Sequence, residues 1–313
     1  MLSLGKKAKW ALILLAIAII GSLLFIFPLI DLINSQNRIT LATTTSTYDS
    51  GLLDYLLPTF EQKTRIKVDI VSVGTGQALE IGKRGDADVL LVHSRVKENE
   101  FIANGYGVHR VCVMYNDFII VGPSSDPAGI KNQNITTAME NLKSAGDAGK
   151  IKFYSRGDGS GTYSKELELW ALINFTPSTL TDKWYFETGA GMGTTITITN
   201  ENDGYTLIDR GTWLAMKDSL SLIVLVEGDQ ILINPYGAIL INPSLYPDVK
   251  YDKAIKFVGF LVSEEGQNLI GSFTKNGEQL FHPIFGHCNE TLGCNTTSEE
   301  VNFWKKYNGG YTG

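Results

Sequence analysis

Histidine and cysteine, the residues on which most transition-metal sites depend, are scarce in this sequence. Among 313 residues there are four histidines and three cysteines. The histidines are scattered, and no pair of cysteines has the CxxC spacing of a zinc or redox site. We therefore expect no metal centre built from protein ligands and no resident cofactor. The histidines are His93, His109, His282 and His287.

Positive charge is also in short supply, because 27 lysines and arginines against 33 aspartates and glutamates leave a net charge of −6. No basic patch with interleaved aromatic residues occurs, so we expect no binding of nucleic acid. A negatively charged protein does not attract small anions through its overall field. Any anion site in this chain must therefore be local, and built from dipoles and a few cations.

The three cysteines fall into two environments. Cys112 lies within an apolar run and is predicted to be a buried thiol. Cys288 and Cys294 lie close together near the C-terminus, where either a small extracellular disulfide or two separate thiols agree with the spacing. No cysteine directly follows the N-terminal hydrophobic run, which excludes a lipid-modified cysteine there.

An uncharged apolar run covers residues 10–30 and follows Lys6, Lys7 and Lys9. At about 1.5 Å per residue, a helix of this length reaches roughly 30 Å, the thickness of a bilayer core. The positive-inside rule places residues 1–9 in the cytoplasm and everything beyond a short linker at 31–37 outside. We expect an uncleaved transmembrane anchor, with a cleaved signal peptide and a secreted protein as the alternative.

Beyond residue 37, patterns typical of strands and helices alternate. Leucines and a phenylalanine at helical spacing from Leu52 to Phe60 predict one amphipathic helix, and a β-branched run follows it. Such alternation favours an α/β fold with helices on both faces of a sheet. Strands are predicted over 38–43, 66–73, 88–92, 151–154 and 222–226, and helices over 50–63, 76–84, 97–104, 134–145, 160–173 and 250–262.

Two longer apolar runs have polar centres. Residues 111–121 are interrupted by Asn116 and Asp117, and residues 231–241 contain the sequence NPYG in their middle. Long strands of this kind suit a pair of crossovers between two lobes. A ligand would then lie in the cleft between the lobes, where carboxyl ends of strands meet helix N-termini.

We therefore predict a two-lobed α/β protein with two hinge crossovers. Each lobe is expected to contain a mixed, mainly parallel sheet with flanking helices. Lobe 1 comprises residues 38–115 plus 237–285, lobe 2 comprises 116–236, and residues 286–313 form a C-terminal extension.

The segment SRGDGSGT at residues 155–162 carries the most chemical information. It is a glycine-rich turn that leads into a helical pattern, with one arginine and several hydroxyl groups. A helix N-terminus presents unpaired backbone N–H groups and the positive end of a dipole, and glycines let an anion approach that backbone. Arg156 adds a charge and a planar fork of donors. The segment predicts capture of a small oxyanion.

Three further segments share this character and stand between a predicted strand and a predicted helix. They are TTTSTYDSG at 43–51, SVGTGQA at 72–78 and GYTLIDRGTW at 204–213. Each one alone is explained equally well as a helix cap or a turn, because Ser, Thr, Asp and Gly are preferred there. Their occurrence at equivalent positions in both predicted lobes favours a binding cleft.

Together these motifs resemble those of a known family. The stretches ATTTSTYDSGLL, VGTGQAL, YSRGDGSGTY and YTLIDRGTW are similar in order and spacing to the tungstate-binding proteins of TupA-type ABC importers, over about residues 38–285. The resemblance implies a periplasmic-binding-protein fold, class II-like, that closes on one tungstate, with molybdate as a poorer or comparable ligand. It also implies delivery of the anion to a membrane permease driven by a cytoplasmic ATPase. We expect the protein to be a monomer.

The chain departs from the family in two places. Many members are freely secreted or lipid-anchored, whereas this chain has a candidate membrane helix at 10–30. Residues 286–313, which include Cys288 and Cys294, extend beyond the family's usual end and have no assigned role.

Tungstate is a tetrahedral dianion without a proton near neutral pH, so each of its oxygens needs a donor. We expect Arg156 to be the charged ligand, and Asp158, which would repel a dianion in contact, to orient Arg156 or to cap the helix at 160. Arg210 is the second candidate cation, with a structural pair to Asp209 or Asp158 as its alternative. The predicted ligands are Thr44, Thr45, Ser46, Thr75, Arg156, Ser160, Gly161 and Thr162, followed by Gly74, Asp158 and Arg210.

Other functions stay open on the sequence. Phosphate-binding proteins have a similar Arg–Asp–Gly–Ser–Gly–Thr cluster in which an acidic residue accepts the proton of hydrogen phosphate, so phosphate or sulfate is the rival ligand. A membrane-anchored anion sensor without transport is a further alternative. An enzyme is not expected, because the glycine-rich segment lacks the Gly-x-Ser-x-Gly spacing and a triad would need the distant His109 or His282.

Overall fold

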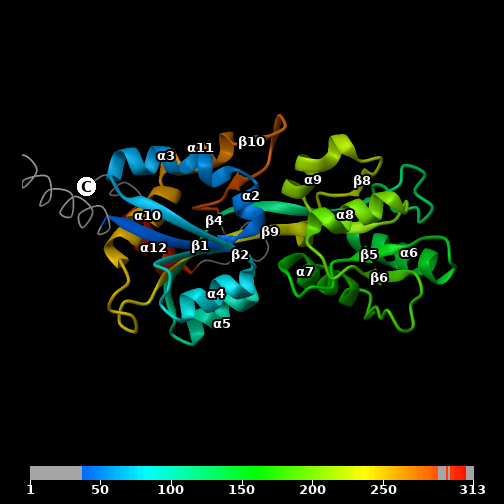
Figure 1. Cartoon of the computed structure of the whole chain (residues 1–313), viewed down its shortest axis with the longest axis horizontal. Coiled ribbons are helices and arrows are strands. Elements are labelled where there is room, and N and C mark those ends of the chain that lie inside the picture. The colour runs from blue at the N-terminus through cyan, green and yellow to red at the C-terminus, as the bar shows by residue number, and fades with distance from the viewer. Residues whose placement is uncertain (1–36, 288–293, 295–296, 308–313) are drawn as a thin grey trace, which may run out of the picture.

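The computed structural model describes residues 37–287, 294 and 297–307. It has two lobes joined by two long strands, which Figure 1 shows running from one lobe into the other. The predicted membrane anchor at 10–30 and the predicted cytoplasmic segment at 1–9 lie outside the described residues. Within the described ranges, no helix is both long and apolar enough to cross a bilayer.

The sheet of lobe 1 has helices on both faces (Figure 1). β1, β2 and β3 pair in parallel, as the alternating pattern predicts. On one face α3 packs on α10 through Phe60 and Phe257, whose ring centroids lie 5.2 Å apart, and α4 covers the other face with Ala78 against Leu90. The elements are β1 (Arg38–Thr44), α2 (Thr45–Asp49), α3 (Leu52–Thr64), β2 (Lys67–Val73), α4 (Thr75–Lys83), β3 (Val89–Val92), α5 (Arg95–Ala103), α10 (Tyr251–Leu261), α11 (Glu264–Ser272), β10 (Thr274–Lys275), β11 (Glu278–Gln279) and β12 (His282–Pro283).

The two crossover strands are β4 (Gly107–Gly122) and β9 (Ile233–Ile241), which pair antiparallel with each other. In lobe 1 the strand order is β12-β4-β9-β3-β1-β2, and β9 also runs antiparallel to β3. The sheets are mixed, as predicted, but the expectation that they are mainly parallel was wrong for the described strands. Two strands that leave and re-enter one lobe side by side run in opposite directions, so the pairs made by β4 and β9 are antiparallel.

Lobe 2 is built on the far half of β4, along which β7 and β8 pair antiparallel, while β5 and β6 form a parallel pair. Its core is rich in aromatic rings, with Trp170 lying 5.3 Å from Phe153 and 5.7 Å from Trp184 between centroids. The sequence patterns did not predict β6 and α8. The elements are α6 (Ile135–Asp147), β5 (Phe153–Ser155), α7 (Gly161–Ala171), β6 (Tyr185–Glu187), α8 (Met192–Glu201), β7 (Thr206–Asp209), α9 (Arg210–Met216), β8 (Ile223–Val226) and the short 3-10 helices η1 (Lys217–Ser219) and η2 (Gln230–Leu232).

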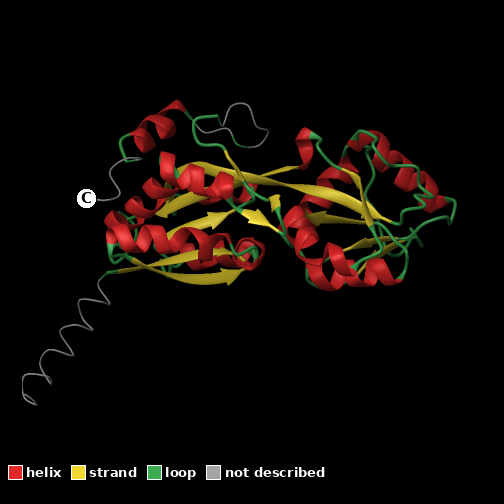
Figure 2. Cartoon of the chain, turned by 90° about the horizontal axis from the view of Figure 1, so that it is seen from above, coloured by secondary structure: helices red, strands yellow, loops and turns green. Residues whose placement is uncertain are grey.

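The polar residues that interrupt the apolar crossovers meet at the junction of the lobes. Asn116 of β4 lies opposite Asn234 of β9, and the Asn234 Nδ2 donates to Asn116 Oδ1 at 2.8 Å. Both side chains are buried, at 2% and 4% exposure. Beyond this point β4 pairs with β7, starting at Phe118. Figure 2 shows the long strands passing without a break through the waist of the molecule.

The C-terminal extension contributes a helix to lobe 1. α12 (Ser298–Lys305) begins with a capping box formed by Thr297 and Glu300. Trp304 is fully buried, and its Nε1 donates to the His109 carbonyl at 2.9 Å. Phe303 stacks on the His109 ring with centroids 3.6 Å apart. The helix is therefore packed into the lobe.

The two described cysteines lie in contact with each other. Cys112 is buried, as predicted, and its Sγ donates to the carbonyl of Cys294 at 3.1 Å. Cys288 lies outside the described residues, as does its predicted disulfide with Cys294.

Replacing Trp304 tests whether the extension stabilises lobe 1. We expect Trp304→Ala to lower the free energy of unfolding by about 3–5 kcal/mol, because it opens a cavity in a packed interface. Urea denaturation measures this, with Lys305→Ala on the exposed side of the same helix as the control. Equal stability of the two variants would show that the helix is not part of the folded core.

Candidate functional site

A cavity of about 360 Å³ lies between the lobes and is lined from both sides. Among the predicted ligands, those from lobe 1 that line it are Thr44, Thr45, Ser46, Gly74 and Thr75. Those from lobe 2 are Arg156, Ser160, Gly161 and Thr162. Asp158 and Arg210 are the predicted residues that do not form its wall.

The lobe 1 wall forms where β1 and β2 end and helices begin. Thr44 caps α2, with its Oγ1 accepting the Thr47 N–H at 3.3 Å, and Ser46 Oγ lies 3.2 Å from the same oxygen. Thr75 is the first residue of α4, and Gly74 is its N-cap without a side chain. The first turn of α4 therefore presents backbone N–H groups beside a cluster of hydroxyls.

The lobe 2 wall is the turn between β5 and α7. Ser160 caps α7, with its Oγ accepting the Tyr163 N–H at 3.2 Å, so its own hydrogen remains available to a ligand. Gly157 has a φ of 60°, and a Cβ built there would lie 2.6 Å from Cβ of Glu187. Only glycine fits this position, which keeps the turn tight against β6.

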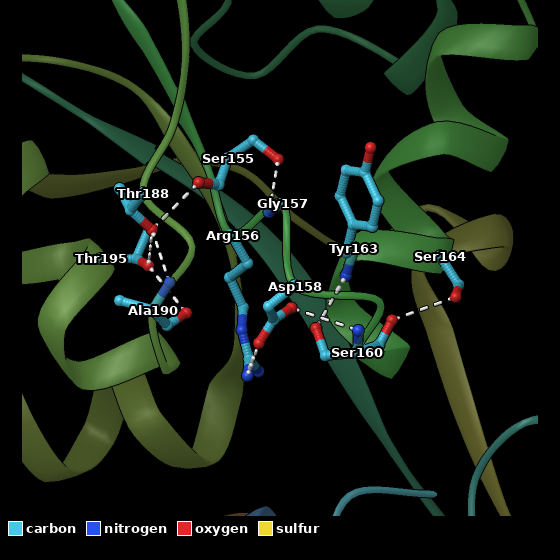
Figure 3. A network of polar contacts seen from close by, with 10 residues as sticks. All are labelled: Ser155, Arg156, Gly157, Asp158, Ser160, Tyr163, Ser164, Thr188, Ala190 and Thr195. Carbon is cyan, nitrogen blue, oxygen red and sulfur yellow. Dashed lines mark hydrogen bonds and ion pairs between the residues drawn. The ribbon is translucent and has the colours of Figure 1, made fainter. Parts of the chain in front are cut away.

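Arg156 extends from this turn with Asp158 bound to it (Figure 3). The Asp158 carboxylate accepts from Arg156 Nη2 and, at 3.1 Å, from the Ser160 N–H. Burial acts to raise the pKa of Asp158, but the bonds from Ser160 and the charge of Arg156 outweigh it and hold the pKa below its ordinary value. Asp158 therefore orients Arg156, the first of the two roles considered for it, while Ser160 is the residue that caps α7.

The Nε of Arg156 is the most informative atom of the site. It is buried, and it has no hydrogen-bond partner among the residues that the structure describes. Buried donors in native proteins are nearly always paired, since an unpaired donor costs about 1–3 kcal/mol. An acceptor supplied by a ligand in the cavity would satisfy this donor, and an oxyanion is such an acceptor.

Sequence reasoning missed one segment of the wall. Gly191, the N-cap of α8, and Gly193 line the cavity, and the preceding turn is held by Thr188 and Thr195, whose hydroxyl oxygens lie 2.8 Å apart (Figure 3). The stretch TGAGMGTT at 188–195 has the composition of the other motifs. A search for every Gly- and Thr-rich stretch of this kind would have found it.

Other residues of the wall were also missed as ligands, and Asp209 and His93 are the two with titratable side chains that the site encloses most; the others are Asp49, Ser50, Gly211, Thr212, Ala215 and Met216. Asp209 is 6% exposed, and its carboxylate caps α9 by accepting from the Thr212 N–H at 2.9 Å and from the Thr212 hydroxyl at 2.7 Å. The start of the helix thus compensates a negative charge at the cavity. His93, which directly follows β3, lines the cavity from lobe 1. In the sequence, only its position directly after a predicted buried strand indicated that His93 could belong to the site.

Arg210 belongs to the hinge. Its Nε and Nη2 donate to both oxygens of Asp117 at 2.7 and 2.6 Å, and Nη2 also donates to Glu227 at 2.7 Å. The structure therefore places Arg210 in a structural pair, the alternative considered for it, but with partners other than Asp209 or Asp158. The pair ties α9 to the crossover strand β4.

The structure also shows where the candidate metal ligands and the histidines considered for a catalytic triad lie. No group of three or more His, Cys, Asp or Glu side chains able to hold a metal ion occurs within the described ranges. The distant histidines considered for a triad lie in lobe 1, where His109 stacks on Phe303 and His282 stacks on Tyr115. Neither lines the cavity.

Helix α7, which follows the arginine turn, also carries a buried carboxyl group. Glu166 of α7 is 2% exposed, and its Oε1 accepts from Tyr185 Oη at 2.8 Å and from Trp170 Nε1 at 3.2 Å. Burial raises the pKa of Glu166 to about 7, although these hydrogen bonds act to lower it.

Glu166→Gln tests this environment through the pH dependence of stability. The pKa of Glu166 is about 7 in the folded protein and about 4.3 in an unfolded chain, so only the folded state holds the proton between these values. Stability should therefore fall as pH rises through this window, by up to about 1.4 kcal/mol per pH unit. Glutamine does not titrate, so the variant loses this contribution.

Urea denaturation at several pH values between about 5 and 7 measures the difference between wild type and variant. Glu168→Gln, at an exposed position on the same helix, is the control and should keep the wild-type slope. Parallel pH profiles for wild type and Glu166→Gln would contradict the raised pKa.

Two α/β lobes on a pair of crossover strands, with a donor-rich cavity between them, define a two-lobed binding protein. A family model described as a PBP superfamily domain matches residues 34–265. A relative from Haloferax volcanii, whose name is that of an ABC transporter anion-binding protein, is 50% identical over 254 residues, 80% of this chain and 72% of its own.

A second relative, the tungstate-binding protein TupA of Peptoclostridium acidaminophilum, is 47% identical over 251 residues, which cover 80% of this chain and 86% of the relative. The solved structure of the tungstate-binding protein TupA from Desulfovibrio alaskensis G20 is 44% identical, with a TM-score of 0.72 and coverage of 79% of this chain and 98% of that chain. The chain belongs to the TupA family of the PBP superfamily.

Proposed function

We propose that this protein is the extracytoplasmic substrate-binding subunit of an ABC importer for tungstate, and that it holds the anion in the cavity between its lobes. The observation that carries the proposal is the buried, unpartnered Nε of Arg156 at a cavity lined with hydroxyls and helix starts. The tungstate-binding names of the relatives support the choice of anion.

The chemistry of the wall suits a fully deprotonated tetrahedral anion. N-termini of α4, α7 and α8 meet there from two lobes, each contributing roughly 0.3–1 kcal/mol and up to about 2 where partly buried. Each charge-assisted hydrogen bond contributes about 1.5–3 kcal/mol. A nanomolar site needs about 12 kcal/mol, so several converging donors together with Arg156 can supply it.

Phosphate is the second candidate, because two carboxylates, Asp49 and Asp209, stand in the cavity wall. A carboxylate there could accept the proton that hydrogen phosphate retains, whereas it would repel a proton-free dianion. Against phosphate, both Asp209 oxygens already accept from Thr212. Asp158, the residue considered for this role from the sequence, is instead engaged by Arg156 and Ser160.

The same proposal includes the protein's surroundings. The apolar run at 10–30 would anchor the binding protein to the outer face of the cell membrane as a monomer. From there it would pass tungstate, or molybdate, to a permease served by a cytoplasmic ATPase.

Calorimetric titration with tungstate, molybdate, phosphate and sulfate separates the candidate ligands. We expect sub-micromolar binding of tungstate, comparable or weaker binding of molybdate, and much weaker binding of the other two. Tungstate should also raise the melting temperature, as any ligand of the native state does. Sub-micromolar phosphate binding without tungstate binding would overturn the proposal in favour of phosphate.

Variants of Arg156 test the assigned charge. Arg156→Ala should weaken tungstate binding at least tenfold while the fold is retained, and Arg156→Lys should restore only part of it, because a point charge replaces a fork of donors. Arg84→Ala is a matched control, since Arg84 binds Asp86 two residues on, as Arg156 binds Asp158, but on the surface. Unchanged affinity in Arg156→Ala would remove Arg156 from the site.

A further inference from the structure

His93 connects the cavity with the hinge. It lines the cavity from lobe 1, and its ring packs on Tyr236 of β9 with centroids 4.8 Å apart. A Cβ built on Gly161, at the start of α7, would lie 3.2 Å from His93 Cε1. The ring therefore reaches from lobe 1 to the helix that carries the lobe 2 wall.

The hydrogen bonds of the hinge fix which ring nitrogen carries a proton. Asn234 Nδ2 donates to Asn116 Oδ1 at 2.8 Å, which leaves Asn234 Oδ1 as the acceptor that faces His93 Nδ1 at 3.1 Å. Nδ1 must therefore be the protonated nitrogen of the neutral ring. Nε2 then carries a lone pair, and it lies 3.5 Å from the hydroxyl oxygen of Ser46, another residue of the cavity wall.

The groups around the ring leave it neutral without a ligand. Burial lowers the pKa of His93 and outweighs the hydrogen bond from its Nδ1 to Asn234. Asp209 in the cavity wall and Glu98 of α5 favour the charged ring, but Glu98 is bound to Arg110 at 2.6 Å. Arg156 opposes protonation from lobe 2, and Tyr236 offers a neutral phenol, because burial raises its pKa.

A dianion changes this balance. Its two negative charges would exceed the single charge of Arg156, and a lone pair on His93 Nε2 would face an oxygen that also carries lone pairs. A proton on Nε2 turns that repulsion into a charge-assisted hydrogen bond and adds a second positive charge to that of Arg156, whose own charge is shared with Asp158.

We propose that binding of a proton-free tetrahedral dianion transfers one proton from solvent to His93 Nε2, so that anion capture is coupled to proton uptake. This inference rests on the proposed function. The Nε2–H bond forms as the bond between the proton and a buffer acid or hydronium ion breaks, and the proton returns to solvent on release. His93 Nδ1 donates to Asn234, which is bonded to Asn116, so the charged ring would also strengthen this hydrogen bond at the hinge.

The coupling sets the pH dependence of affinity. In the free protein the pKa of His93 lies below its ordinary value, and bound anion raises it. Affinity is therefore highest at low pH and falls as pH rises between the two values, by about tenfold per pH unit when a full proton is taken up. Release of the anion is correspondingly favoured on the alkaline side.

Calorimetric titration of the full protein with sodium tungstate, in buffers of different ionisation enthalpy, counts the protons taken up. Slightly above neutral pH we expect uptake approaching one proton per tungstate in wild type. His93→Gln, whose amide donates without titrating, should bind with no uptake and with an affinity independent of pH. His282→Gln replaces a partly buried histidine outside the cavity and should behave as wild type.

The outcomes are distinguishable. Absence of tungstate binding at any pH would refute the proposed function itself. Binding without proton uptake in wild type would overturn the coupling alone, and uptake that persists in His93→Gln would assign the proton to another group, with Asp49 and Asp209 the carboxyl groups of the wall. NMR of the wild-type imidazole resonances needs no variant: on addition of tungstate, the His93 signals should move to the positions of an imidazolium, and unchanged signals would contradict the proposal.

Discussion

The antiparallel pairing of β4 with β9 is the constraint on which the rest of this structure depends. These strands are shared by both lobes, so they hold the helix starts of one lobe opposite those of the other. Their apolar residues pack in the cores of the lobes. The polar pair Asn116 and Asn234 lies at the junction between the lobes. The cavity exists because strands that end on either side of this point direct α4, α7 and α8 toward one space.

Charge at the cavity is local, as a protein with a net charge of −6 requires. Within the described residues, Arg156 is the only arginine or lysine of the wall. Asp158 holds it without entering the wall, and the first turn of α9 compensates Asp209. A dianion therefore meets one fixed cation, helix dipoles, hydroxyls and an imidazole, together with the carboxylates of Asp49 and Asp209. Such a site favours oxyanions whose oxygens carry no proton.

Much of this architecture could be predicted from local patterns. Alternating strands and helices, the two crossovers and the strand-to-helix motifs each leave a signal within a few residues, and Thr44, Thr75 and Arg156 were found in this way. The features that the sequence patterns did not predict correctly have a common cause. Arg210 pairs with Asp117, which lies 93 residues away in the sequence. The tautomer of His93 depends on its hydrogen bond to Asn234, and the direction of each strand pair depends on which strands become neighbours. Only tertiary pairing decides such features.

The central claim is that one tetrahedral oxyanion lies between the lobes and completes the hydrogen bonding of Arg156. Anomalous scattering from tungsten in crystals grown with tungstate tests it most directly, because the peak locates the metal independently of any assigned role. We predict one peak inside the cavity, with an oxygen accepting from Arg156 Nε and others near the starts of α4 and α7. A peak outside the cavity, or a bound anion without contact to Arg156, would contradict the account.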